Sequence, residues 1–128
     1  MAEVEIARRP AGYVHVRIDG ELDLATRLPP VEAIGADVAP VVVDLCGVRF
    51  LSLAGVDGVE AIVAALTVRG RAVRVVCAAP GPVWRLVCFL RLQRRWSVHH
   101  EIAHAVADLG LRPCAEVPVP RPSLGSRS

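Results

Sequence analysis

The strongest constraint on the fold is an alternation of short apolar runs with a helix-like segment in the middle of the chain. Residues 41–45 (VVVDL) and 73–78 (VRVVCA) are short and rich in β-branched side chains, which is typical of strands buried on both faces of a sheet. Between them Val56, Val59, Val63 and Leu66 recur at spacings of three and four, so they share one face of a helix. This order predicts parallel strands joined by crossover helices.

Weaker patterns extend this core in both directions. Residues 4–7 and 13–18 flank a turn signal at residues 9–12 (RPAG) and predict a hairpin, in which His15 is expected to face solvent. We predict helices at residues 29–38, 83–92 and 101–109, and a short last strand at residues 96–98. The expected architecture is one α/β domain over residues 1–111, with a mixed, mainly parallel sheet of four to five strands and about four helices. Residues 112–128, rich in Pro, Ser and Arg, are predicted to form a flexible tail.

Charge and cysteine content narrow the classes of function. A net charge of +2 on 128 residues argues against nucleic acid or an anionic membrane surface as a partner. No apolar run approaches the roughly 20 residues of a membrane-spanning helix, and no signal peptide is visible. The four cysteines form no CxxC motif, which favours free thiols in a reducing compartment. We therefore expect a cytoplasmic protein without direct membrane insertion.

Two segments carry a resemblance to a known family. Residues 20–26 (GELDLAT) resemble the GELDxxT loop of STAS domains, and residues 41–55 (VVVDLCGVRFLSLAG) resemble their central signature. In the family this signature is a strand, then Asp-Leu-Ser/Thr-Gly-Val, then Phe-x-Asp-Ser-Ser/Ala-Gly at the start of a helix. The frame is kept at Asp44, Leu45, Gly47, Val48, Phe50 and Gly55. The resemblance covers about residues 4–110 and implies a bacterial anti-sigma factor antagonist, a non-catalytic module without a cofactor that regulates transcription by binding an anti-sigma factor of the serine-kinase type.

The sequence departs from the family where regulation takes place. In the antagonists a serine in this signature is phosphorylated by the anti-sigma factor, and the matching position here is Leu53, which has no hydroxyl. We expect Leu53 to act instead as an exposed apolar contact that binds the partner regardless of kinase activity. Ser52 is predicted to cap the following helix, with a displaced phosphorylation site and a partner contact as weaker alternatives.

The resemblance also implies which surface meets the partner. The predicted partner-binding residues lie in the polar loop and at the start of the helix: Gly20, Glu21, Leu22, Asp23, Ser52, Leu53, Ala54, Gly55, Asp57 and Glu60. For Glu21 and Asp23, an ordinary solvated loop is an equal alternative. Asp44 is expected to bond loop amides at the end of its strand. An alternative function is that of a STAS accessory subunit in a phospholipid-transport or stress-signalling complex.

An HExxH motif at His100, Glu101 and His104 suggests a function of another class. On a helix the two histidines would share a face and could coordinate one zinc ion. The glutamate would activate a zinc-bound water, as in a metallopeptidase. A catalytic zinc also needs a third protein ligand, and the residues after His104 do not supply the familiar one. We therefore expect no metal site and no enzyme, and keep the zinc peptidase as a remote alternative.

Overall fold

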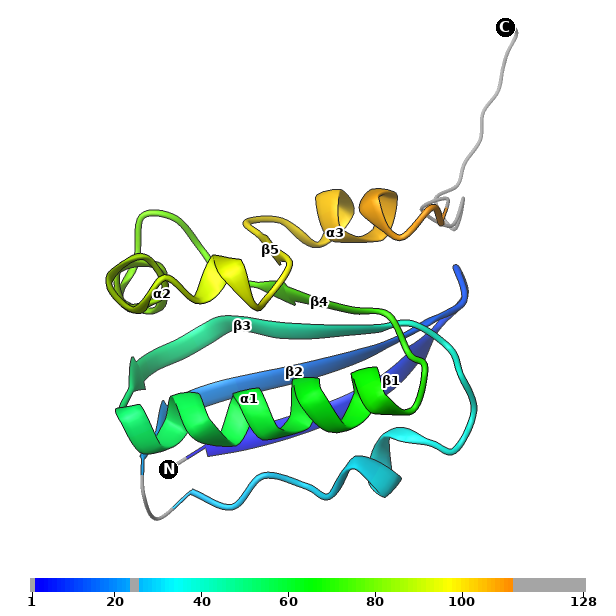
Figure 1. Ribbon diagram of the computed structural model, residues 1–128, viewed down its shortest axis with the longest axis horizontal. Helices are drawn as coiled ribbons and strands as arrows, with labels where there is room; N and C mark the ends of the chain where they lie inside the picture. Colours follow the sequence, from blue (N-terminus) through cyan, green and yellow to red (C-terminus); the bar gives the residue numbers. More distant parts are fainter. Residues whose placement is uncertain (1, 24–25, 112–128) are drawn as a thin grey trace, which may run out of the picture.

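Five strands form one sheet in the order β1-β2-β3-β4-β5 in the computed structural model, which describes residues 2–23 and 26–111 (Figure 1). The strands are β1 (Ala2–Arg9), β2 (Tyr13–Leu22), β3 (Val41–Leu51), β4 (Val73–Val76) and β5 (Val98–His99). β1 and β2 form the antiparallel hairpin, and every other neighbouring pair is parallel. The mixed, mainly parallel sheet expected from the sequence is confirmed.

The helices pack against both faces of this sheet. The larger core joins one face to α1 (Leu53–Val68), α2 (Pro82–Leu90) and the 3-10 turn η2 (Leu92–Arg94). α3 (Ile102–Asp108) covers part of the opposite face, where Ala105 and Val106 meet Tyr13, Val42 and Val76. Adjacent β3 residues such as Val42 and Val43 therefore point into different cores, as the pleat of a strand requires.

Helix ends follow the local sequence closely. Ser52 caps α1, because its hydroxyl oxygen accepts a hydrogen bond from the Gly55 amide at 3.0 Å, and this prediction is confirmed. α3 ends in a Schellman arrangement: Gly110 has a φ of 78°, and the Leu111 amide donates to the Val106 carbonyl at 3.2 Å.

Two predicted elements are wrong. The helix expected at residues 29–38 is a single 3-10 turn, η1 (Val31–Ile34), which buries only Ile34 and ends at Gly35 with a φ of 110°. One buried residue provides too little apolar area to hold a longer helix in place. The loop expected at residues 46–51 is instead the second half of β3. This half pairs with the second half of β2, which is also longer than predicted, and the pairing contains two register shifts.

The predicted tail at residues 112–128 lies outside the described residues. Within residues 2–23 and 26–111, no helix has both the length and the apolar character needed to cross a bilayer.

Candidate functional site

The end of β2 and the first turn of α1 are fastened together by backbone contacts. The Ser52 amide donates to the Leu22 carbonyl at 2.9 Å. Gly55, in the first turn of the helix, lies directly over this carbonyl, and a Cβ at that position would be 2.5 Å from the Leu22 oxygen. Only a residue without a side chain lets the helix approach so closely, so the GELD segment and the start of the helix form one rigid unit.

Thr26 is hydrogen-bonded to residues at the end of β2 and just after it. Its hydroxyl accepts from the Asp23 amide at 3.0 Å, and the Glu21 carbonyl and the Asp23 carboxylate are its alternative acceptors at 3.1 Å. The Thr26 amide also donates to the Asp23 carbonyl at 3.1 Å. The threonine of the GELDxxT pattern therefore has a structural role through its hydrogen bonds to Glu21 and Asp23.

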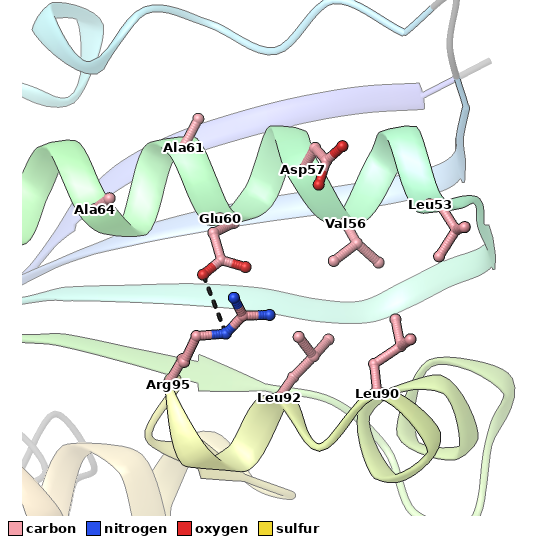
Figure 2. Close-up of a pocket in the computed structure, with 9 residues that line it drawn as sticks. All are labelled: Leu53, Val56, Asp57, Glu60, Ala61, Ala64, Leu90, Leu92 and Arg95. Atoms are coloured by element: carbon pink, nitrogen blue, oxygen red, sulfur yellow. Dashed lines mark ion pairs between the residues drawn. The ribbon is translucent and has the colours of Figure 1, made fainter.

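The most exposed apolar residue of this unit is Leu53, at the first position of α1. Its side chain is 65 % exposed and lines a groove of about 660 Å³ between α1 and η2 (Figure 2). We call this the α1–η2 groove; it is lined by Leu53, Val56, Asp57, Glu60, Ala61, Ala64, Leu90, Leu92 and Arg95. Leu53 and Leu90 enter it from opposite sides at one end, and Arg95 and Glu60 approach to 3.3 Å further along (Figure 2). The groove thus combines an apolar end with a charged middle.

The structure divides the predicted partner-binding residues into two groups. Gly20, Leu22 and Gly55 are buried, so their prediction as partner contacts is corrected: they support the surface from inside. Gly20 and Leu22 belong to β2 and not to a loop, and Gly55 packs against the Leu22 carbonyl. At least partly exposed are Glu21, Asp23, Ser52, Leu53, Ala54, Asp57 and Glu60.

Six residues that line the groove were not predicted: Val56, Ala61, Ala64, Leu90, Leu92 and Arg95. The last three come from the end of α2, from η2 and from the residue after η2, about 40 positions further along the chain than Leu53. No local sequence pattern marks which apolar residues of a short helix border a groove. Only the packing of η2 beside α1 brings them to the site.

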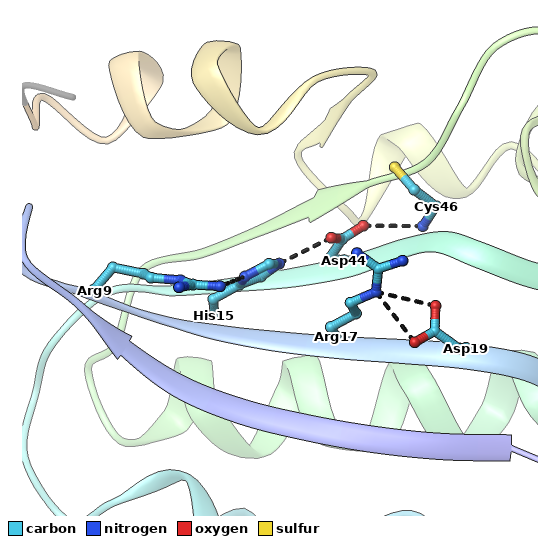
Figure 3. Close-up of polar contacts among 6 residues, drawn as sticks. All are labelled: Arg9, His15, Arg17, Asp19, Asp44 and Cys46. Carbon is cyan, nitrogen blue, oxygen red and sulfur yellow. Dashed lines mark hydrogen bonds and ion pairs between the residues drawn. The ribbon is translucent and has the colours of Figure 1, made fainter. Parts of the chain in front are cut away.

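A buried polar pair lies on the opposite face of the sheet (Figure 3). His15 Nε2 is 2.8 Å from Asp44 Oδ2, and an Arg9 Nη2 donates to His15 Nδ1 at 3.0 Å. An arginine only donates, so in this arrangement Nδ1 accepts from Arg9 and Nε2 donates to Asp44. His15 is 9 % exposed, and the prediction that it faces solvent is wrong, because Asp44 on the adjacent strand and Arg9 enclose its ring.

Asp44 lies within β3 and not at a strand end as expected. Its Oδ1 accepts from the Cys46 amide at 3.0 Å. Burial by itself would raise the pKa of this carboxyl, but the hydrogen bonds from His15 and Cys46 outweigh it and hold the pKa below its ordinary value. Partial desolvation and the same carboxylate raise the pKa of the Cys46 thiol to about 12. A thiol that stays protonated at neutral pH is a poor nucleophile, so the raised pKa of Cys46 gives no support for a nucleophilic role.

The residues of the HExxH motif do not share a helix face. His100 precedes α3, its Nδ1 is 3.0 Å from the Cys77 carbonyl, and its ring meets the Trp84 ring edge-on at 4.5 Å. His104 points to solvent and is 67 % exposed. Across residues 2–23 and 26–111, no three His, Cys, Asp or Glu side chains are grouped to hold a metal ion.

This sheet order, with a long β3 that leads directly into a capped helix, is a fold shared with solved anti-sigma factor antagonists. An anti-sigma factor antagonist from Mycobacterium paratuberculosis superposes with a TM-score of 0.69 at 23 % identity, covering 86 % of this chain and 95 % of that one. The unphosphorylated form of the anti-sigma factor antagonist SpoIIAA superposes with a TM-score of 0.52 at 19 % identity, covering 84 % and 97 %. No protein-family model matches the sequence, and the search of curated proteins finds no match.

Proposed function

We propose that this protein is a non-catalytic bacterial module that binds an anti-sigma factor of the serine-kinase type in the cytoplasm and so regulates transcription. The fold, the GELDLAT and VVVDLCGVRFLSLAG motifs, and the antagonists among its structural neighbours support this proposal. The contact surface is the first turn of α1, the at least partly exposed residues Glu21 and Asp23, and the α1–η2 groove.

The observation that carries the proposal is the exposure of Leu53 at the first position of α1. A phosphate at a helix N-terminus adds about −1.5 to −2 charge, which the free amides and the helix dipole hold in place. Leucine cannot accept a phosphate and instead offers an apolar side chain worth about 1.5–3 kcal/mol when fully buried. Binding of the partner is therefore constitutive and is not released by its kinase activity.

The matched positions Leu53 and Val68 test this proposal. Both are exposed apolar residues of α1, 65 % and 86 % exposed, at opposite ends of the helix. The probe is a purified serine-kinase anti-sigma factor from the same genome, and the measurement is its Kd by calorimetry. Leu53→Asp should weaken binding at least tenfold, about 1.4 kcal/mol, while Val68→Asp should leave it within about twofold.

Incubating the wild-type protein with the kinase and ATP should not change the Kd. An unaltered Kd in Leu53→Asp would place the interface elsewhere. Loss of binding on incubation with ATP would show that the protein has a phosphorylation switch after all, and Ser52 would be the first candidate for the phosphorylated residue. Specific binding to a phospholipid transporter subunit, with none to the anti-sigma factor, would favour the alternative role as an accessory subunit.

A further inference from the structure

Two phenylalanines are exposed together beside the carboxyl end of β3. Phe50 is 52 % exposed and Phe89, on α2, is 82 % exposed. With Arg49, Arg85 and Leu86 they line one open depression of about 440 Å³, which we call the Phe50–Phe89 patch. Contiguous exposed apolar groups of this kind mark interaction sites more often than single exposed residues do.

The topology of the sheet creates this patch. β4 pairs with β3 only as far as Asp44, so the second half of β3 has a strand neighbour on one side alone, and α2 packs beside it (Figure 1). α2 turns Val83 and Val87 into the core. Arg85 and Leu86 lie four and three residues before Phe89, so the three form a second stripe along the same helix, next to Phe50.

The patch carries positive charge without a neighbouring carboxylate. Some arginines elsewhere pair with carboxylates, as Arg8 does with Asp37 at 2.8 Å and Arg74 with Asp108. Arg49 and Arg85 have no ion pair or side-chain hydrogen bond within the described part of the chain, and no carboxylate lines the patch. The surface is apolar at its centre with uncompensated positive charge at its rim.

The α1–η2 groove, on the other side of α2, differs from this patch in its charge. Leu90, the neighbour of Phe89, enters the α1–η2 groove, whose lining includes Asp57 and Glu60 (Figure 2). α2 therefore separates a groove with acidic residues from a basic patch. The acidic residues nearby and the small number of arginines favour a protein segment over an anionic lipid surface as the occupant.

We propose that the Phe50–Phe89 patch docks an acidic amphipathic segment of a protein partner, with apolar side chains against the two phenylalanines and carboxylates against Arg49 and Arg85. Arginine and aromatic residues are enriched at protein interfaces for these two reasons. This surface is separate from the Leu53 contact of the proposed function and does not depend on which protein occupies the α1–η2 groove.

A synthetic amphipathic helical peptide of about 15 residues tests the proposal. One form carries Leu and Phe on one face and Glu on the other; its matched form carries Lys in place of Glu. Amide NMR titration of the whole protein should locate the acidic peptide at Phe50, Arg85 and Phe89, and the Lys form should bind at least tenfold more weakly. The double variant Arg49→Glu/Arg85→Glu should reverse this preference.

Phe89→Ser should lower affinity for the acidic peptide at least tenfold without unfolding the protein, since Phe89 is 82 % exposed. Val68→Ser, 86 % exposed on α1, is the matched control and should have no effect, and neither should Leu53→Asp. Equal binding of the two peptides, or NMR shifts confined to the α1–η2 groove, would overturn the proposal. Concentration-dependent dimerisation, or adsorption to phosphatidylglycerol vesicles, would likewise overturn it if Phe89→Ser abolished the effect.

Discussion

Three polar or charged side chains are buried within residues 2–23 and 26–111, namely His15, Asp44 and Arg71. His15 and Asp44 satisfy each other across neighbouring strands. The Arg71 guanidinium donates to the Gly35 and Ala39 carbonyls at 2.8 Å each, which ties the segment after η1 to the start of β4. Each of the three is hydrogen-bonded to groups from a distant part of the chain. Removing one partner leaves the other buried without a hydrogen bond, which costs the full free energy of its desolvation.

His15→Ala is expected to destabilise the protein by about 2–4 kcal/mol, because it leaves the Asp44 carboxylate buried without its main partner. His104→Ala, a matched change at an exposed histidine, should cost less than about 0.5 kcal/mol. Urea denaturation at neutral pH measures both. Similar losses of unfolding free energy in the two variants would contradict a stabilising role for the buried His15–Asp44 pair.

The same comparison has a defined pH dependence. The pKa of Asp44 is lower in the folded state than in the unfolded chain, so its ionised form stabilises the fold at neutral pH. This contribution is complete above the unfolded pKa of about 4 and is lost as the pH falls through the lower folded pKa. The stability difference between wild type and His15→Ala should therefore shrink in denaturation curves taken at progressively more acidic pH.

The start of α1 depends on a glycine for contact and not for an unusual φ. Gly55 and Gly58 lie on the same helix, but their surroundings differ. A Cβ at Gly55 meets the fixed Leu22 backbone at 2.5 Å, whereas a Cβ at Gly58 meets the movable end of the Leu28 side chain at 3.1 Å. An identical substitution therefore has opposite consequences three residues apart.

Gly58→Ala is expected to be neutral or to stabilise by up to about 1 kcal/mol, the helix-propensity gain of alanine. Gly55→Ala should instead cost about 1–3 kcal/mol, because the first turn must move away from β2. Thermal unfolding of both variants, with amide NMR shifts at Leu22 and Ser52, measures the effect. A gain in stability in both glycine-to-alanine variants would show that Gly55 is not needed for close contact between α1 and β2.

Two cores of unequal size hold the molecule together. The larger one joins α1, α2 and η2 to one face of the sheet, while the smaller one attaches α3 through Ala105 and Val106. A seven-residue helix has little stability of its own and depends on these contacts. We infer that α3 opens more readily than the sheet it covers.

Native-state hydrogen exchange should therefore show α3 amides exchanging at least about tenfold faster than those of residues 41–44 in β3. Val106→Ala should accelerate exchange in α3 further, while Ala107→Gly, at an exposed position of the same helix, controls for helix propensity alone. Equal protection of α3 and β3 would mean that the whole domain opens as one unit.

Local chemistry was enough to predict the order of strands and helices, the cap at Ser52 and the end of α3 at Gly110. It was also enough to recognise that Leu53 cannot carry a phosphate. Periodicity and capping involve residues a few positions apart, and a functional group belongs to a single residue. These features can therefore be recognised without knowledge of the fold.

Packing decided the rest. The length of β3, the burial of His15 and the interior positions of Leu22 and Gly55 depend on which segment lies beside each residue. The α1–η2 groove and the Phe50–Phe89 patch join residues about 40 positions apart. Burial is a property of neighbours in space, and the chain acquires those neighbours only when the sheet forms.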